Sequence, residues 1–266
     1  MLKFLCLGSG SSGNCYYLSY NNNAILIDAG IGIRSIKKSL KDKGLPFDAI
    51  RAVFVTHDHA DHIKCVGVLG EKYNIPIYST EMVHQGIRKS YCVTEKLTAN
   101  HIKLIEKENT FSFLDFTITA FEVPHDGTDN VGYCIQCDGK TFCFLTDLGH
   151  ITPPAANYIE KANYLILEAN YDEDMLRNGP YPFMLKQRIK GAQGHLSNDE
   201  AAEIVYRNSA HLNHVWLCHL SENNNTPEKA FSTVSNYLQH KGIDVAVAPS
   251  VHVLKRMSPS DFFDLR

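Results

Sequence analysis

A dense group of potential metal ligands after one apolar run constrains this chain more than any other stretch. Residues 52–55 (Ala-Val-Phe-Val) predict a buried strand, and Thr-His-Asp-His-Ala-Asp-His follows at residues 56–62. Neutral imidazole and carboxylate groups suit zinc, and manganese and iron are further candidates. Packed as ordinary core, these side chains would bury several polar groups at a high cost in free energy. The heptapeptide therefore predicts a metal site at a strand end; the simpler alternative is a solvated turn.

The composition allows a large core but indicates no particular partner. The chain has 266 residues, of which 44% are hydrophobic and 21% charged, and its formal net charge is -3. This length permits one or two domains. Because the chain is slightly acidic, nucleic-acid binding would depend on a local basic patch or on bound metal ions.

The N-terminal segment and the cysteines predict a cytoplasmic protein without membrane association. Residues 1–7 are apolar, but Gly-Ser-Gly at 8–10 ends the run before a signal-peptide core or membrane span could form. Without a secretory signal, the eight scattered cysteines predict reduced thiols. Cys134, Cys137 and Cys143 lie in two strand-like runs joined by an Asp-Gly turn, which favours packed thiols over a structural zinc or redox site.

Hydrophobic periodicity predicts a chain in which strands and helices are interspersed. The expected strands are 3–7, 15–19, 24–27, 52–55, 77–79, 116–122, 131–137, 141–145, 164–167, 214–218, 245–248 and 251–254. The expected helices are 33–43, 63–73, 81–90, 198–209 (with a Ser197/Glu200 capping box) and 227–240 (capped by Thr226). Residues 172–191 contain two prolines and predict at most a broken helix. This order predicts one α/β domain over residues 1–266, with its site along one edge of packed sheets.

Polar side chains of ligand type recur where predicted strands end. They are Asp28, His125, Asp147, Glu168 and His219. An acid at the end of a buried strand usually needs a partner, so Asp28 is expected to orient a ligand or a loop.

A glycine- and serine-rich loop separates the first two predicted strands. Residues 8–14 read Gly-Ser-Gly-Ser-Ser-Gly-Asn. Backbone N–H groups and hydroxyls in such a loop can cradle a phosphate. The loop lacks the Gly-Lys-Ser/Thr of a P-loop, and a plain tight turn accounts equally well for its composition.

The order of these motifs resembles that of the metallo-β-lactamase superfamily. The points of likeness are the strand-end acid, His-x-His-x-Asp-His, and then His, Asp and His at three later strand ends, between residues 28 and 219. The resemblance implies an α/β fold, the αββα four-layer sandwich, in which two mixed β-sheets are flanked by helices. It also implies a dinuclear metal site at the sheet edge.

The same resemblance implies the ligands of two divalent metal ions, zinc or manganese, with iron a further candidate. These are His57, His59 and His125 for one ion, Asp61, His62 and His219 for the other, and Asp147 between them. Asp28 would support the histidine loop from the second shell. Two ions about 3.5–4 Å apart suit hydrolysis, because they can hold a hydroxide at neutral pH and stabilise a departing oxyanion.

The second half of the chain resembles the ribonuclease Z-like phosphodiesterase branch. The likeness lies in Glu-Ala-Asn at 168–170 and His-Leu-Ser-Asn-Asp-Glu at 195–200. In that branch the histidine contacts the phosphate and helps to protonate the leaving oxygen, and the glutamate is oriented toward it. The resemblance therefore implies that Asp61, Glu168 and His195 are catalytic. An imidazolium beside the phosphate would counter the extra negative charge of the transition state.

Within this branch the chain most resembles the bacterial WalJ (YycJ-type) family. Further likenesses are Leu-Gly-Ser-Gly-Ser-Ser-Gly-Asn at 7–14, Pro-His-Asp at 124–126 and Cys-His-Leu-Ser at 218–221. The family is associated with 5′-to-3′ exonuclease action on DNA, which makes nucleic acid, DNA in particular, or a small phosphodiester the expected partner. It also implies that Ser9, Ser11, Ser12 and Asn14 line the phosphate end of the cleft. We find neither an inserted β-CASP domain nor a long arm that grips transfer RNA, which favours a compact nuclease or a small phosphodiesterase over those relatives.

Several alternatives stay open at this point. A small-molecule cyclic phosphodiesterase fits the same residues, and a thioesterase like glyoxalase II fits the metal ligands. Diiron flavoproteins share the fold, but they use a glutamate where this chain has His59 and carry a flavin domain. A non-catalytic metal-stabilised module would need four closing ligands and no additional acids. The oligomeric state is open.

The remaining histidines follow no ligand pattern and are predicted to be surface or core residues. They are His84, His101, His150, His211, His214, His240 and His252. His150 and His252 are the strongest exceptions, because each follows a strand-like run. Lys186, Arg188 and Lys190 form a locally basic run that predicts a solvated face, with contact to a nucleic-acid backbone as the alternative.

Overall fold

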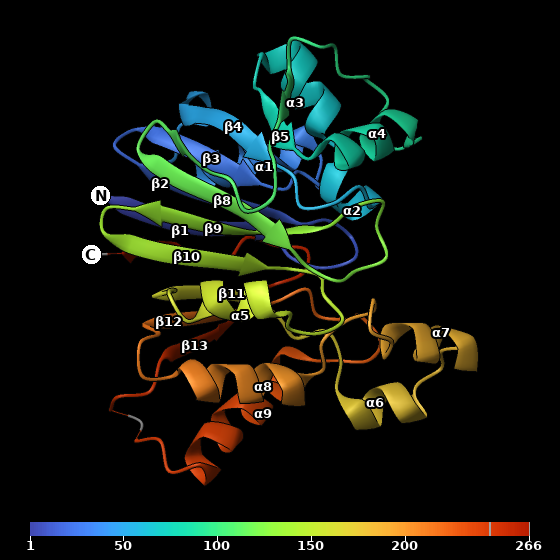
Figure 1. The fold of residues 1–266 in the computed structure, drawn as a ribbon, viewed down its shortest axis with the longest axis vertical. Coiled ribbons are helices and arrows are strands. Elements are labelled where there is room, and N and C mark those ends of the chain that lie inside the picture. Colours follow the sequence, from blue (N-terminus) through green and yellow to red (C-terminus); the bar gives the residue numbers. More distant parts are fainter. Residues whose placement is uncertain (245, 266) are drawn as a thin grey trace. The chain divides into compact units, whose positions relative to one another are not determined.

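This computed structural model describes residues 1–244 and 246–265. Within them the strands form two mixed sheets of seven strands each, and helices flank both sheets (Figure 1). This arrangement confirms the predicted fold class. The chain divides into two compact units. The first comprises Met1–Ala120, Gly127–Val131 and Lys255–Arg266, and the second comprises Phe121–Asp126 and Gly132–Leu254. That they act as one domain stays a prediction.

The first unit contains a complete sheet of order β14-β1-β2-β3-β4-β5-β6. Its strands are β1 Leu2–Gly8, β2 Cys15–Tyr20, β3 Asn23–Ile27, β4 Ile50–Phe54, β5 Ile77–Ser79, β6 Ile102–Leu104 and β14 Phe263–Leu265. Pairing is antiparallel from β14 to β3 and parallel from β3 to β6. The unit also holds α1 Ile33–Asp42, a short 3-10 helix Phe47–Ala49, α2 Ala60–Ile63, α3 Val66–Tyr73, α4 Glu81–Lys89, β7 Thr110–Phe113 and the first part of β8 Phe116–Glu122.

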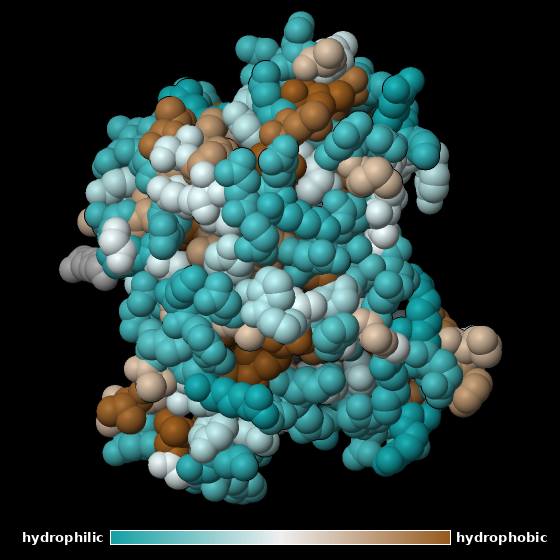
Figure 2. Space-filling model, in the orientation of Figure 1, coloured by the Kyte–Doolittle hydropathy of each residue, from teal (hydrophilic) through white to brown (hydrophobic). Residues whose placement is uncertain are grey.

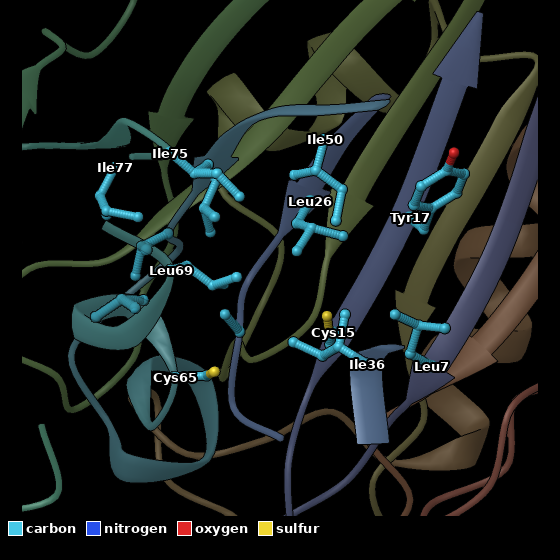
Figure 3. Packing of buried hydrophobic residues seen from close by; sticks show 14 of the residues in the cluster. Leu7, Cys15, Tyr17, Leu26, Ile36, Ile50, Cys65, Leu69, Ile75 and Ile77 are labelled. Carbon is cyan, nitrogen blue, oxygen red and sulfur yellow. The ribbon is translucent and has the colours of Figure 1, made fainter. Parts of the chain in front are cut away.

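Alternate residues of this sheet face the helices and build the core of the first unit (Figure 3). Leu5 and Leu7, Cys15 and Tyr17, and Ala24 and Leu26 are spaced by two along their strands, as side chains on one face of a strand must be. They pack with apolar residues of α1, α3 and α4, namely Ile36, Leu40, Val66, Leu69, Val83 and Ile87. This packing fixes the strand ends that carry the ligand loop.

The second unit contains β9 Val131–Cys137 (from Gly132), β10 Lys140–Leu145, β11 Tyr164–Glu168, β12 His214–Cys218 and β13 Ser250–Val253, in the order β13-β12-β11-β10-β9. Strands β10 to β13 are parallel. Its helices are α5 Pro153–Ile159, α6 Glu173–Asn178, α7 Phe183–Ile189, α8 Asn198–Asn208 and α9 Pro227–His240. Apolar residues of β10 to β13 pack with α5, α8 and α9, and the predicted Ser197–Glu200 capping box is present.

One predicted helix begins late and one predicted strand is wrong. The helix predicted over 63–73 is α3 Val66–Tyr73, and Ile63 is instead the last residue of α2; between them the backbone N–H of Cys65 donates to the carbonyl of Ala29 (2.8 Å). The predicted strand 245–248 is a turn at 246–248, where the backbone N–H of Ala248 donates to the carbonyl of Asp244 (2.9 Å); Val245 lies outside the described residues. The sequence analysis also missed β6, β7, β14 and α5, whereas residues 172–191 form the predicted broken helix as α6 and α7.

The cysteine prediction agrees with the structure. Cys134, Cys137 and Cys143 are buried, as packed thiols are expected to be. Within residues 1–244 and 246–265, every helix is too short or too polar to cross a membrane.

Candidate metal centre

The histidine loop lies where two parallel strands of the first unit end. Asp28 follows β3, and Thr56 and His57 come after its parallel neighbour β4. Asp28 Oδ2 lies 2.7 Å from His62 Nδ1, and Asp28 Oδ1 accepts a hydrogen bond from the Thr56 backbone (2.8 Å). Burial raises the pKa of Asp28, and interactions with His62 and Thr56 offset part of that rise. Because the carboxylate accepts the Nδ1 proton of His62, Nε2 of this ring carries the lone pair and is the atom that can bind a metal ion.

Asp28 and His219 both adopt a backbone conformation that is rare outside glycine. Their φ angles are 60° and 53°. Such left-handed geometry costs about 1–3 kcal/mol at a non-glycine residue and persists where surrounding contacts enforce it. Each residue directly follows a buried strand, and the left-handed conformation turns the backbone sharply there.

Asn14 and Gly30 hold the Asp61–His62 end of the loop. Asn14 Nδ2 lies 3.1 Å from Asp61 Oδ2 and 2.9 Å from His62 Nε2, and Asn14 Oδ1 accepts a hydrogen bond from the Gly10 backbone (2.9 Å). At Gly30, a Cβ atom would lie 1.6 Å from the carbonyl oxygen of Asp61. Residue 30 must therefore be glycine. The Asn14 amide orients the side chains of Asp61 and His62.

The predicted phosphate-binding residues of the serine loop divide into two pairs. Ser9 and Asn14 are fully buried, and Ser9 Oγ lies 2.9 Å from the Tyr16 hydroxyl. Ser11 and Ser12 are exposed at the turn. Contact with phosphate stays a prediction, with Ser11 and Ser12 the two hydroxyls open to a ligand.

Asp58, which the sequence analysis did not single out, stabilises the backbone between His57 and His59. Its Oδ1 accepts a hydrogen bond from the Thr128 backbone (2.9 Å), and its Oδ2 accepts one from the Thr128 hydroxyl (2.5 Å). A Cβ atom at Gly86, inside α4, would lie 1.8 Å from Asp58 Oδ2. A glycine inside a helix lowers the stability of the helix, so it usually has a packing reason. Gly86 could therefore have indicated from the sequence that another group lies close to α4.

We therefore expect Gly86→Ala to weaken metal binding. The new methyl group displaces the Asp58 carboxylate, which costs about 1–3 kcal/mol of folding free energy and about tenfold to a hundredfold in metal affinity. Chelator competition with zinc measures the affinity, and thermal unfolding of the metal-free protein measures the stability. In an Asp58→Ala background, Gly86→Ala should have little further effect. Equal losses in both backgrounds would show that Asp58 is not the group displaced.

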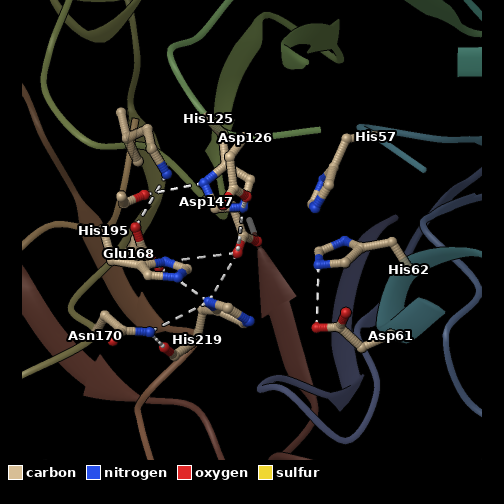
Figure 4. Close-up of polar contacts among 12 residues, drawn as sticks. His57, Asp61, His62, His125, Asp126, Asp147, Glu168, Asn170, His195 and His219 are labelled. Atoms are coloured by element: carbon tan, nitrogen blue, oxygen red, sulfur yellow. Dashed lines mark hydrogen bonds and ion pairs between the residues drawn. The ribbon is translucent and has the colours of Figure 1, made fainter. Parts of the chain in front are cut away.

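The second unit presents its polar residues at the ends of three neighbouring parallel strands (Figure 4). Asp147 follows β10, Glu168 ends β11 and His219 follows β12. Together with His195 they offer ligand atoms within 4.8 Å of one another. His219 Nδ1 lies 2.9 Å from Glu168 Oε1 and 3.0 Å from Asp147 Oδ1. These carboxylates engage Nδ1 and leave Nε2 of His219 for a metal ion.

Glu168 is a buried carboxylate with four donors. Oε1 lies 2.7 Å from His195 Nδ1 and 2.9 Å from His219 Nδ1. Oε2 accepts backbone hydrogen bonds from Leu148 (3.0 Å) and Leu196 (3.1 Å). Burial favours a raised pKa for Glu168, but the charge of His195 and these hydrogen bonds outweigh it and lower the pKa. Glu168 is therefore an ionised anchor for both imidazoles.

The pKa values of His195 and His125 shift in opposite directions. Burial lowers the pKa of His195, but the charge and hydrogen bond of Glu168 outweigh burial and raise it. Burial dominates at His125 and lowers its pKa. The carbonyl of Gly194 can only accept, so His125 carries its proton on Nδ1 (2.9 Å), and its Nε2 is a neutral ligand atom. His195 thus tends to be cationic, and His125 neutral.

Two further residues support this half of the site. Asn170 Nδ2 donates to the backbone carbonyl of His219 (2.9 Å). A Cβ atom at Gly194 would lie 2.1 Å from the carbonyl oxygen of Ile189, so a side chain there would displace the carbonyl that holds His125. Sequence reasoning identified Asn170 and Gly194 only as parts of motifs, because their partners lie on other elements.

Six of the seven other histidines have contacts within their own unit, and His240 is exposed at the end of α9. His84 lies near the Lys103 carbonyl, His101 near Glu71, His150 near the Ala192 carbonyl, His211 near the Ala162 carbonyl, and His214 near His252. The basic run is also engaged within the second unit: Lys186 donates to the carbonyls of Arg177 and Gly179, Arg188 pairs with Asp126, and Lys190 pairs with Glu173.

With this fold and these strand-end ligands, the chain has the features of a metallo-hydrolase. The model of the beta-lactamase superfamily domain matches residues 23–219. The chain is 36% identical to exodeoxyribonuclease WalJ of Streptococcus pneumoniae, over 92% of this chain and 91% of that protein. It is 32% identical to exodeoxyribonuclease YycJ of Bacillus anthracis, over 94% of each. The chain therefore belongs to the metallo-β-lactamase superfamily of hydrolases, and within it to the family that contains WalJ and YycJ.

Solved structures support the fold. The metallo-beta-lactamase fold protein YhfI from Bacillus subtilis superposes with a TM-score of 0.71 at 19% identity, covering 97% of this chain and 98% of that one. Zinc-bound PqqB from Methylobacterium extorquens gives a TM-score of 0.71 at 17% identity, covering 99% and 100%. At these identities the likeness concerns the fold alone.

Proposed function

We propose that this enzyme hydrolyses phosphodiesters with two divalent metal ions, and that it degrades DNA from the 5′ end. The observation that carries the proposal is the Glu168–His195 pair beside Asp147 and His219, with 2.7 Å between Glu168 Oε1 and His195 Nδ1. A cationic imidazole next to metal ligands suits a substrate with a negatively charged phosphate. The similarity to WalJ and YycJ, both named exodeoxyribonucleases, supports DNA as the substrate.

The donor chemistry fits divalent ions. His62, His125 and His219 each engage Nδ1 with a carboxylate or a carbonyl, which is how proteins orient an imidazole whose Nε2 binds a metal. Five imidazoles with two carboxylates suit zinc, and manganese and iron accept the same groups. Two ions held there would polarise the phosphate and make a water molecule nucleophilic near neutral pH.

We assign the ligands as the resemblance implies. They are His57, His59 and His125 for one ion, Asp61, His62 and His219 for the other, and Asp147 for both. In this assignment both compact units contribute ligands, so residues 1–266 act as one hydrolase domain. Asp28 positions His62, and Ser11 and Ser12 contact the substrate phosphate.

The acid in the reaction is His195. Glu168 orients the imidazole through Nδ1, and its charge and hydrogen bond raise the pKa of His195, which favours the protonated form. The Nε2 proton is then available to the leaving oxygen of the substrate, which would otherwise depart as an alkoxide.

A digestion panel tests this function. End-labelled 5′-phosphorylated duplex DNA, the matching RNA, a bis-aryl phosphodiester and a thioester are incubated with the protein and manganese or zinc. We expect stepwise release from the 5′ end of DNA and slower cleavage of the bis-aryl ester. Thioester cleavage without phosphodiester cleavage would reject the proposal, and cleavage of the bis-aryl ester without cleavage of DNA or RNA would indicate a small-molecule phosphodiesterase.

A further inference from the structure

The segment between Glu168 and His195 forms an ordered arm on the second unit. It contains α6 and α7, whose own small core is made by Tyr171, Leu176 and Ile189. Its two ends are joined, because the backbone N–H of Asn198 donates to the carbonyl of Tyr171 (2.8 Å). The arm is thus a preformed structure rooted beside the Glu168–His195 pair.

Helix α7 begins away from His195 and ends against it. The backbone N–H of His195 donates to the carbonyl of Ile189, the last residue of α7 (2.9 Å). Phe183, the first residue, lies six residues earlier, which places it about 9 Å along the helix axis at 1.5 Å per residue. That distance is within the reach of one or two nucleotides from a phosphate held at His195.

The outer face of α7 carries apolar and basic side chains. Phe183 and Met184 are 71% and 75% exposed, and Figure 2 shows apolar side chains gathered over α7. Met184 and Arg188 are four residues apart and share a face of the helix, with Gln187 exposed next to them. Residues 183–190 contain three cations and no acid. Lys186 and Lys190 bind within the arm, whereas the Arg188 side chain is 59% exposed in its pair with Asp126.

We propose that this face of α7 binds the strand of nucleic acid next to the phosphate that His195 contacts. A base stacks on Phe183 and Met184, and a backbone phosphate meets Arg188. Apolar rings beside cations are how proteins bind single strands without sequence preference. The C-terminal end of α7 contacts the backbone of His195, and the half-exposed Arg188 guanidinium, paired with Asp126, is the cation of this face that a phosphate can reach. The inference rests on the proposed nuclease function and adds the substrate contact that a small diester would lack.

Phe183→Ala tests the proposal. Loss of one stacked base predicts a KM for single-stranded 5′-phosphorylated DNA that is about tenfold to a hundredfold higher, with kcat nearly unchanged. Cleavage of a bis-aryl phosphodiester, which does not reach α7, stays within about twofold. Phe231→Ala, at another exposed phenylalanine of the second unit (46% exposed), is the matched control and should leave both substrates unaffected.

A tryptophan at the same position gives a direct reading of stacking. The chain has one tryptophan, Trp216, and it is fully buried. Phe183→Trp should restore the KM for DNA, and its emission should be quenched when oligothymidine is added. Phe231→Trp should show no quenching.

Three results would overturn the inference. An unchanged KM for DNA in Phe183→Ala would remove α7 from the substrate path. Dissociation of a dimer by Phe183→Ala, with unchanged KM, would show that this face binds a second copy of the chain. If the wild-type protein cleaves the bis-aryl ester but no nucleic acid, the proposed function and this inference fail together, whereas the first two results reject the arm alone.

Discussion

Asp61→Ala is expected to abolish turnover of every phosphodiester substrate. The Asp61 carboxylate lies 3.5 Å from His62 Nε2 and accepts a hydrogen bond from Asn14, so it is held next to a proposed ligand atom. Without it, one ion loses a ligand and the attacking water its orientation. The loss of several kcal/mol of transition-state stabilisation lowers the rate by at least about 10³-fold. Initial rates on DNA and on a bis-aryl ester, with metal analysis of the same samples, measure the effect.

The control for this variant is Asp42→Ala, an exposed carboxylate at the end of α1. It should retain full activity and metal content. An Asp61→Ala protein with two tightly bound ions and more than a tenth of the wild-type rate would contradict the assignment of Asp61.

His195→Ala is expected to lower turnover of DNA by about 10²–10⁴-fold and to leave the metal content near two ions per chain. His195 has no assigned metal contact, and the role that we propose for it is to protonate the leaving oxygen. Because p-nitrophenolate leaves without a proton, the loss on a bis-p-nitrophenyl ester should be much smaller than the loss on DNA. His150→Ala, at an exposed histidine of the same unit, should change neither rate.

Two outcomes would count against this role for His195. Loss of metal in His195→Ala would make the residue a ligand instead of an acid. Equal rate losses on DNA and on the aryl ester would show that His195 binds phosphate without protonating the leaving group.

The polar residues at the strand ends could be predicted because their signals are local. An apolar run that stops at an acid or a histidine marks a buried strand and a functional turn, and this identified Asp28, Asp147, Glu168 and His219. The sequence could not show the left-handed backbone of Asp28 and His219, because only the surrounding contacts enforce it.

Residues whose role depends on a distant partner were missed or assigned otherwise. Asp58 reaches Thr128, 70 positions away, and Gly86 gives it room. The sequence places Asn14 in a glycine- and serine-rich loop, and it could not show that the Asn14 amide lies against Asp61 and His62. The exposed face of α7 could not be identified either, because the exposure of Phe183 depends on how the arm packs.

We propose that the assigned histidines and aspartates hold two ions as a bridged pair. Electron paramagnetic resonance of the manganese-loaded protein tests it most directly, because ions about 3.5–4 Å apart are magnetically coupled. We predict a coupled spectrum at two manganese ions per chain, which Asp147→Ala converts to that of isolated ions. Two uncoupled ions in the wild-type protein, or one ion at saturation, would show that the ligands do not hold a bridged pair of ions.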